Sequence, residues 1–128
     1  MKRLLIGLML LMTATAASAE WTRVGDTDEH IQFVDRATIR RNSNLVKMWD
    51  LAAYKTVRDT VGHPYWSRNN QREYDCKEEQ VRTLAFTVFV GKMGDGKVVF
   101  THSETEKWDP ISPESVGETL WKIACGKK

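Results

Sequence analysis

Three arginines on one short segment have the type and spacing to bind an anionic ligand. Arg36, Arg40 and Arg41 all lie in the stretch RATIRR. Guanidinium groups bind sulfate and phosphate oxygens in pairs, so the ligand this cluster predicts is a sulfated glycan or a lipopolysaccharide phosphate. A solvated turn, in which the arginines pair with nearby acids, explains the same pattern.

A second candidate is the stretch HPYWSR, which combines two large aromatic side chains with a cation. Tyr65, Trp66 and Arg68 fall in what reads as a long loop. Long loops on small domains often carry function, and exposed aromatic residues beside arginine are typical of protein-binding surfaces. In the alternative, Tyr65 and Trp66 fold back over the body of the domain.

Residues suited to catalysis do not form a recognisable set. Glu104 and Glu106 are close in sequence, but nothing places two carboxylates across a cleft, as acid–base chemistry requires. His102 and Ser103 are adjacent, so on a strand their side chains point to opposite faces. The chain has no nucleophile elbow, zinc-protease motif or phosphate loop. We therefore predict a protein without catalytic activity and without a cofactor.

The chain has two cysteines, Cys76 and Cys125. In an exported protein they are expected to form one structural disulfide, and closing so long a loop stabilises a fold by about 4 kcal/mol in the chain-entropy model. A free thiol, an intermolecular bridge or a metal site are the alternatives. A metal site needs partners at short spacing, which the scattered histidines do not supply; they are His30, His63 and His102.

The first 19 residues read as a secretory signal peptide. Lys2 and Arg3 precede a short apolar run, and Ala17-Ser18-Ala19 has the form that a signal peptidase cleaves. The run is too short for a permanent membrane span. No cysteine lies at the expected cut, so we predict no lipid anchor and a periplasmic or secreted product.

Residues 20–128 are expected to form a single domain. The full chain has 19 basic and 17 acidic residues. Loss of Lys2 and Arg3 with the signal peptide leaves no formal net charge. Such a protein has no long-range attraction to nucleic acid or to an anionic membrane.

Most of this domain reads as β-strands. Alternation of apolar and polar residues and turn signals at residues 42–44 and 94–96 predict about six strands. We expect them at residues 21–25, 30–35, 45–54, 72–82, 83–91 and 97–104, the fourth and fifth being one long pair or one bent strand. A single helical turn capped by Asp35 is expected over residues 36–41, and residues 55–71 read as irregular.

One helix is expected at the C-terminus. Ser112 is placed to cap it, Pro113 suits its first turn and Gly126 suits its end. Val116, Leu120, Ile123 and Ala124 share one face, which must cover the sheet. The fold class is therefore α+β, an antiparallel sheet with a C-terminal helix on one face. The Cys76–Cys125 bond would tie the helix end to the strand that carries Cys76.

Four segments together resemble the surface-adhesin protein E family. They are EYDC, DRATIRRNSNLVKMWDL, WDPISPES and WKIAC, and the resemblance runs from about Trp21 to Cys125. It implies an antiparallel sheet of about six strands with a C-terminal helix, and the same disulfide. It also implies adhesion to host matrix and serum proteins. The adhesin that gives the family its name looks lipid-anchored, and this chain lacks the acceptor cysteine.

We therefore expect a non-enzymatic, extracytoplasmic binding module whose partner is a host matrix protein or an envelope component. A small periplasmic inhibitor or envelope-maintenance protein shares the same sequence features. Two further possibilities are a homodimer formed through an exposed sheet edge and a small hydrophobic ligand held between helix and sheet.

Overall fold

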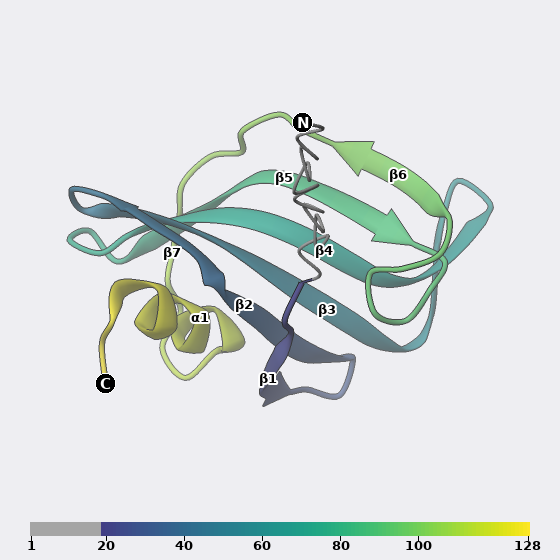
Figure 1. Ribbon diagram of the computed structural model, residues 1–128, viewed down its shortest axis with the longest axis horizontal. Coiled ribbons are helices and arrows are strands. Elements are labelled where there is room, and N and C mark those ends of the chain that lie inside the picture. Colours follow the sequence, from purple (N-terminus) through teal and green to yellow (C-terminus); the bar gives the residue numbers. More distant parts are fainter. Residues whose placement is uncertain (1–18) are drawn as a thin grey trace, which may run out of the picture.

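The computed structural model describes residues 19–128, so almost all of the predicted signal peptide lies outside the described part. The domain is one antiparallel sheet with one helix (Figure 1). The elements are β1 (Thr22–Asp26), β2 (His30–Asn42), β3 (Leu45–Thr60), β4 (His63–Asp75), β5 (Gln80–Phe89), β6 (Val98–His102), β7 (Asp109–Pro110) and α1 (Val116–Cys125). The predicted fold class is confirmed.

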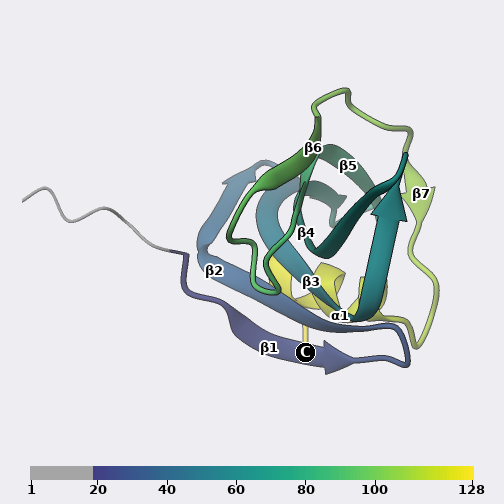
Figure 2. The same cartoon turned by 90° about the vertical axis from the view of Figure 1, so that its right-hand side faces the viewer.

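The strands follow one another through the sheet in the order β1-β2-β3-β4-β5-β6, and the short β7 pairs with β5. Every neighbouring pair from β1 to β6 has a register shift. Such β-bulges bend strands and increase their twist. Figure 2 accordingly shows a strongly curved sheet.

The prediction of a helical turn over residues 36–41 is wrong, because β2 includes this whole segment. Asp35 does cap a local turn, since its carboxylate accepts a hydrogen bond from the Ala37 backbone at 3.1 Å. The turn is the bulge between Asp35 and Arg40, and the Thr38 hydroxyl accepts from the Trp49 backbone across the strand pair at 3.0 Å. Pairing with β3 overrides the local helical signal.

The prediction that residues 55–71 are irregular is also wrong. This segment forms the end of β3, a two-residue turn and most of β4. The bulge between Ala53 and Arg58 breaks the period of two that marks a strand, and the residues between them are mostly exposed. The turn residues Val61 and Gly62 have φ of 51° and 78°, as a type I′ hairpin turn requires.

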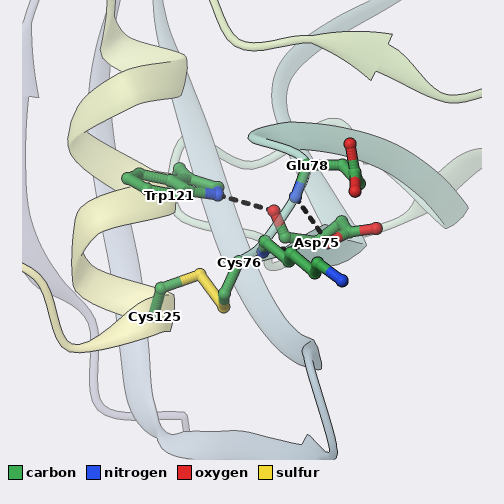
Figure 3. Close-up of a disulfide and its surroundings, with 6 residues drawn as sticks. Asp75, Cys76, Glu78, Trp121 and Cys125 are labelled. Atoms are coloured by element: carbon green, nitrogen blue, oxygen red, sulfur yellow. Dashed lines mark hydrogen bonds between the residues drawn. A yellow bond between two sulfur atoms is a disulfide. The ribbon is translucent and has the colours of Figure 1, made fainter.

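Cys76 lies in the turn between β4 and β5, not on a strand as predicted. The Asp75 carboxylate accepts backbone hydrogen bonds from Glu78 at 2.9 Å and Lys77 at 3.0 Å, and these bonds lower the pKa of Asp75 (Figure 3). The Asp75 carbonyl in turn accepts from the Trp121 indole at 2.9 Å. These bonds fix the turn against α1 beside the cysteine.

The predicted disulfide is confirmed. Cys76 and Cys125 are joined with their Cα atoms 5.6 Å apart, and the bond links the last turn of α1 to the β4–β5 turn (Figure 3). Beneath α1 the core consists of side chains from one face of the sheet, here called the helix face. Its buried residues are Val34, Val46, Met48 and Tyr74, which pack on Leu120, Trp121 and Ala124.

The loop between β5 and β6 covers part of the opposite face of the sheet, around Leu51 and Ser67. The Ser67 hydroxyl accepts from the Gly94 backbone at 2.9 Å and donates to the Gly91 carbonyl at 2.5 Å. Leu51 and Ser67 are fully buried there. The hairpin predicted at Gly94–Gly96 is confirmed, although its loop is longer than the tight turn expected.

The helix begins later than predicted. Its N-cap is Ser115, whose hydroxyl accepts from the Glu118 backbone at 3.1 Å, so Ser112 and Pro113 precede the helix. Gly126 ends it with φ of 67°, as expected, because a left-handed residue there favours glycine.

The capping geometry gives a matched pair of variants. We expect Ser115→Ala to lower the free energy of unfolding by about 1 kcal/mol, because the Glu118 amide loses its acceptor. Ser112→Ala should leave it unchanged within about 0.5 kcal/mol, since only the Ser112 backbone carbonyl is used. Urea unfolding of both variants tests this, and equal losses would contradict the assignment of the cap.

Candidate functional site

A cavity of about 480 Å³ lies between the helix face of the sheet and the first half of α1. Strands β2, β3, β4 and β5 supply its floor, and the segment between β6 and α1 supplies one wall. The lining is mainly polar and includes His30, Gln32, Arg68, Asn70, Arg72 and Glu106. A cavity thus lies between helix and sheet, where a small hydrophobic ligand was considered, but its lining is polar; ligand binding there stays a prediction.

Asp50, on β3 beneath the cavity, has no exposed surface and organises the floor. Its Oδ1 accepts from Gln32 Nε2 at 3.1 Å and from Asn70 Nδ2 at 2.9 Å. Its Oδ2 accepts from Arg72 Nε at 2.7 Å. A buried carboxylate is tolerated only when it is paired and hydrogen-bonded, and three donors from two neighbouring strands meet that need.

Arg68 is held at the edge of the same network. Its Nε donates to Asn70 Oδ1 at 2.6 Å, and its guanidinium lies 3.8 Å from the centre of the Phe86 ring. Burial, followed by repulsion from Arg72, lowers the pKa of Arg68 from its usual value. No carboxylate in residues 19–128 forms an ion pair with this guanidinium, as the Asp50 carboxylate does with Arg72.

At the other end of the floor, His30 Nε2 lies 3.0 Å from Gln32 Oε1. The His30 ring meets the Tyr54 ring edge-on, and the Arg58 guanidinium lies over the Tyr54 ring, 4.5 Å from its centre. Arg58 pairs with Glu29 at 3.1 Å at the exposed rim. Burial raises the pKa of Tyr54.

Tyr65 and Trp66 do not lie in a loop, which corrects the prediction for HPYWSR. Both are on β4 and half-buried. Tyr65 packs edge-on against Tyr54, and Lys92 from the β5–β6 loop lies over the Trp66 ring at 4.7 Å. Arg68 separates from them and turns into the cavity, so the three candidates do not form one site.

Arg36, Arg40 and Arg41 lie on the exposed half of β2, near the β2–β3 turn. Arg40 Nη1 donates to the Ala37 and Ile39 carbonyls at 2.9 Å each, which holds the bulge. Within residues 19–128 none of the three forms an ion pair with an acid, contrary to the solvated-turn alternative. They remain a predicted polyanion site.

Large exposed apolar side chains occur on both the β3–β4 and the β5–β6 hairpin, and the turns of these hairpins lie at the same end of the molecule (Figure 1, right). We call this surface the hairpin end. Its large exposed residues are Val57, Val61, Val90, Met93, Val98 and Phe100. Val61 is 93% exposed and has a positive φ, a conformation that is a genuine outlier for a β-branched residue.

Apart from Arg68, sequence reasoning does not identify the residues that build the cavity. Asp50 offered the clearest signal, since it interrupts the otherwise apolar strand positions of VKMWDLAAY. Asn70 and Arg72 were assigned to different segments, so their common face was not visible. Within residues 19–128 no group of three metal-ligating side chains is present, and no helix has the length and hydropathy to cross a bilayer.

Together these features define a small disulfide-bonded α+β domain with one helix on a curved meander sheet. The sequence model of the family described as Surface-adhesin protein E matches residues 21–126. The chain therefore belongs to the surface-adhesin protein E family. This is a family of adhesins, found at the surface or secreted, and not an enzyme family.

Solved structures support the same fold. Crystal form II of Haemophilus influenzae protein E superposes with a TM-score of 0.69 at 10% sequence identity, covering 88% of this chain and 91% of that one. The selenomethionine form of the same protein gives a TM-score of 0.60 at 10% identity, with 85% and 95% covered. No significant match was found among curated proteins.

Proposed function

We propose that this protein is an exported, non-enzymatic binding module that contacts a protein partner, a host matrix protein or an envelope component, through the hairpin end. The predicted signal peptide, the disulfide and membership of an adhesin family support export and binding. Self-association through the edge strands β1 and β6 stays a prediction.

The proposal rests mainly on the backbone conformation and the exposure of Val61. A type I′ turn strongly favours asparagine or glycine at its first central position, yet this turn has a valine. A non-glycine residue in the left-handed region costs about 1–2 kcal/mol, and a fully exposed apolar side chain gains nothing from folding in return. Strain of this kind persists where function requires it.

Other side chains at the hairpin end fit this role. Val57, on β3, and Met93, in the β5–β6 loop, are exposed and apolar. Trp66, on β4, is half-buried and lies beside Lys92 of the β5–β6 loop. Apolar anchors with an aromatic residue and a cation nearby are typical of the energetically important part of a protein interface.

Val61→Asn separates folding from binding. We expect the variant to be more stable than the wild type by about 1 kcal/mol, because asparagine tolerates positive φ. We expect it to bind a partner about fivefold to tenfold more weakly, since one apolar anchor is lost. Urea unfolding measures the first effect, and titration against immobilised basement-membrane extract and an envelope fraction of the source organism measures the second.

Ser43→Asn is the matched control for this variant. Ser43 has φ of 58° in the β2–β3 turn, so the substitution tests the same backbone effect at the opposite end of the sheet. Its binding should equal that of the wild type. Unchanged binding by Val61→Asn, or equal weakening by both variants, would overturn the assignment of the hairpin end.

Protease accessibility on intact cells, with lysed cells as control, tests the proposed surface location. Cleavage on intact cells is expected for an adhesin. Cleavage only after lysis would reject surface adhesion and favour the periplasmic inhibitor or envelope-maintenance role.

A further inference from the structure

The cavity beside α1 has features of a built binding site that packing does not explain. Gln32, Asp50 and Asn70 occupy buried positions on three successive strands, where apolar residues usually stand. Replacing a buried ionic network by well-packed apolar side chains is often neutral or stabilising. The effect of this network that the structure shows is to orient Arg68 and Arg72.

Both arginines are held through Nε, which leaves their terminal guanidinium nitrogens free to bind a ligand. Each uses its Nε atom for the network, Arg68 toward Asn70 and Arg72 toward Asp50. Both residues line the cavity, and their terminal nitrogens donate no hydrogen bond to any residue in the range 19–128. Two oriented guanidinium groups suit the two oxygens of a carboxylate, which they can bind in bidentate fashion.

The wall beside β5 carries the opposite charge. Glu106, from the segment that leads into β7, and Asp109, the first residue of β7, also line the cavity. The Glu106 backbone donates to the Thr83 carbonyl at 2.9 Å, and Thr83 is the β5 partner of Arg72. Neither carboxylate forms an ion pair within residues 19–128, whereas Glu29 at the outer rim is neutralised by Arg58.

We propose that this cavity binds a small zwitterion of the amino-acid or short-peptide class, with its carboxylate on Arg68 and Arg72 and its ammonium group on Glu106 and Asp109. The cavity volume of about 480 Å³ lies in the range of roughly 300–1,000 Å³ that is usual for small-molecule sites. A polyanion would be repelled by the two carboxylates. A hydrophobic ligand would leave the charges on both walls desolvated and unpaired.

The test uses four kinds of probe in NMR titrations of the ¹⁵N-labelled mature protein. The first is a panel of free dipeptides with small, aromatic and charged side chains. The second and third are the same dipeptides with an acetylated N-terminus or an amidated C-terminus, and the fourth is inorganic phosphate. We expect at least one free dipeptide to bind with a Kd of roughly 1 mM or tighter. Each blocked form should bind about tenfold more weakly, and phosphate should bind more weakly than the free dipeptide.

Variants test which wall of the cavity binds the carboxylate of the ligand and which binds its ammonium group. Arg68→Gln should weaken binding of the free dipeptide about tenfold but should not weaken the amidated form further. Glu106→Gln should also weaken binding of the free dipeptide about tenfold, because it removes a partner of the ammonium group. It should not weaken binding of the acetylated dipeptide further, since that form has no ammonium group. Lys47→Gln, which removes an exposed charge from the opposite face of β3, is the control and should bind like the wild type.

Thermal melting of Arg68→Gln checks that the fold is retained, and Arg68→Lys, which keeps the charge but loses the bidentate geometry, provides a second variant. Absence of binding by every free dipeptide at millimolar concentration would overturn the proposal. Equal or tighter binding of phosphate, or wild-type affinity in both Arg68 variants, would also overturn it. Because the dipeptides are titrated in the absence of any protein partner, these results do not depend on partner binding.

Discussion

Replacing Cys76 and Cys125 together by serine is expected to lower the free energy of unfolding by about 4 kcal/mol, with a range of about 2–5 kcal/mol. The bond closes a loop with a sequence separation of 49 residues, which restricts the unfolded chain. It also holds the last turn of α1 on the β4–β5 turn. Such a loss is a large share of the roughly 5–15 kcal/mol by which small domains are stable.

Urea unfolding of the oxidised wild type and of the double variant measures this loss. The wild type in excess reductant is the control and should unfold at the midpoint of the variant, since both lack only the covalent link. Limited proteolysis should then cut near Gly126 sooner in the variant, because the helix end is released. A midpoint equal to that of the oxidised wild type would show that the link does not stabilise the fold.

Asp50→Ala is the second substitution for which we expect a large effect, a loss of about 3–5 kcal/mol. The carboxylate accepts from Asn70 Nδ2 and Arg72 Nε, so its removal leaves these two donors without their acceptor, whereas Gln32 Nε2 keeps the Phe33 and Leu51 carbonyls. The cationic charge of Arg72 would also lose its partner. Urea unfolding of this variant gives the size of the effect, and a loss below about 1 kcal/mol would contradict it.

The double variant Asp50→Leu with Arg72→Met separates stability from function at the same site. Replacing both partners by apolar side chains should recover most of the stability lost in Asp50→Ala, because no unpaired charge remains. The same variant should lose dipeptide binding, since Arg72 is gone and Arg68 is no longer supported through Asn70. Recovery of stability together with wild-type binding would show that the network does not serve the cavity.

The sequence alone was sufficient for the features that depend on local signals. Alternating apolar residues predicted most strands, Gly126 predicted the end of the helix, and the two cysteines predicted the disulfide. The C-terminal apolar stripe correctly placed α1 on the sheet. These features follow from periodicity, from backbone preference and from the count of a single residue type, which neighbouring strands do not alter.

Predictions failed where pairing between strands overrides local preference. The segment around Arg40 reads as a helical turn but pairs with β3 through a bulge, and residues 55–71 read as irregular because a bulge hides their alternation. Tyr65 and Trp66 were therefore placed in a loop. A bulge is fixed by the partner strand as much as by its own residues, so one segment read by itself does not reveal it.

The sequence by itself predicted an exported protein and determined its α+β class, its covalent link and its family. Only the tertiary structure decided which polar residues act together. Asp50 is on β3, Asn70 and Arg72 are on β4, and Glu106 precedes β7. Strand register places Asp50 beneath the cavity that the other three residues line, and it separates Arg68 from Tyr65 and Trp66. The physical reason is that a side chain's face on a strand depends on register, and a shift of one residue reverses it.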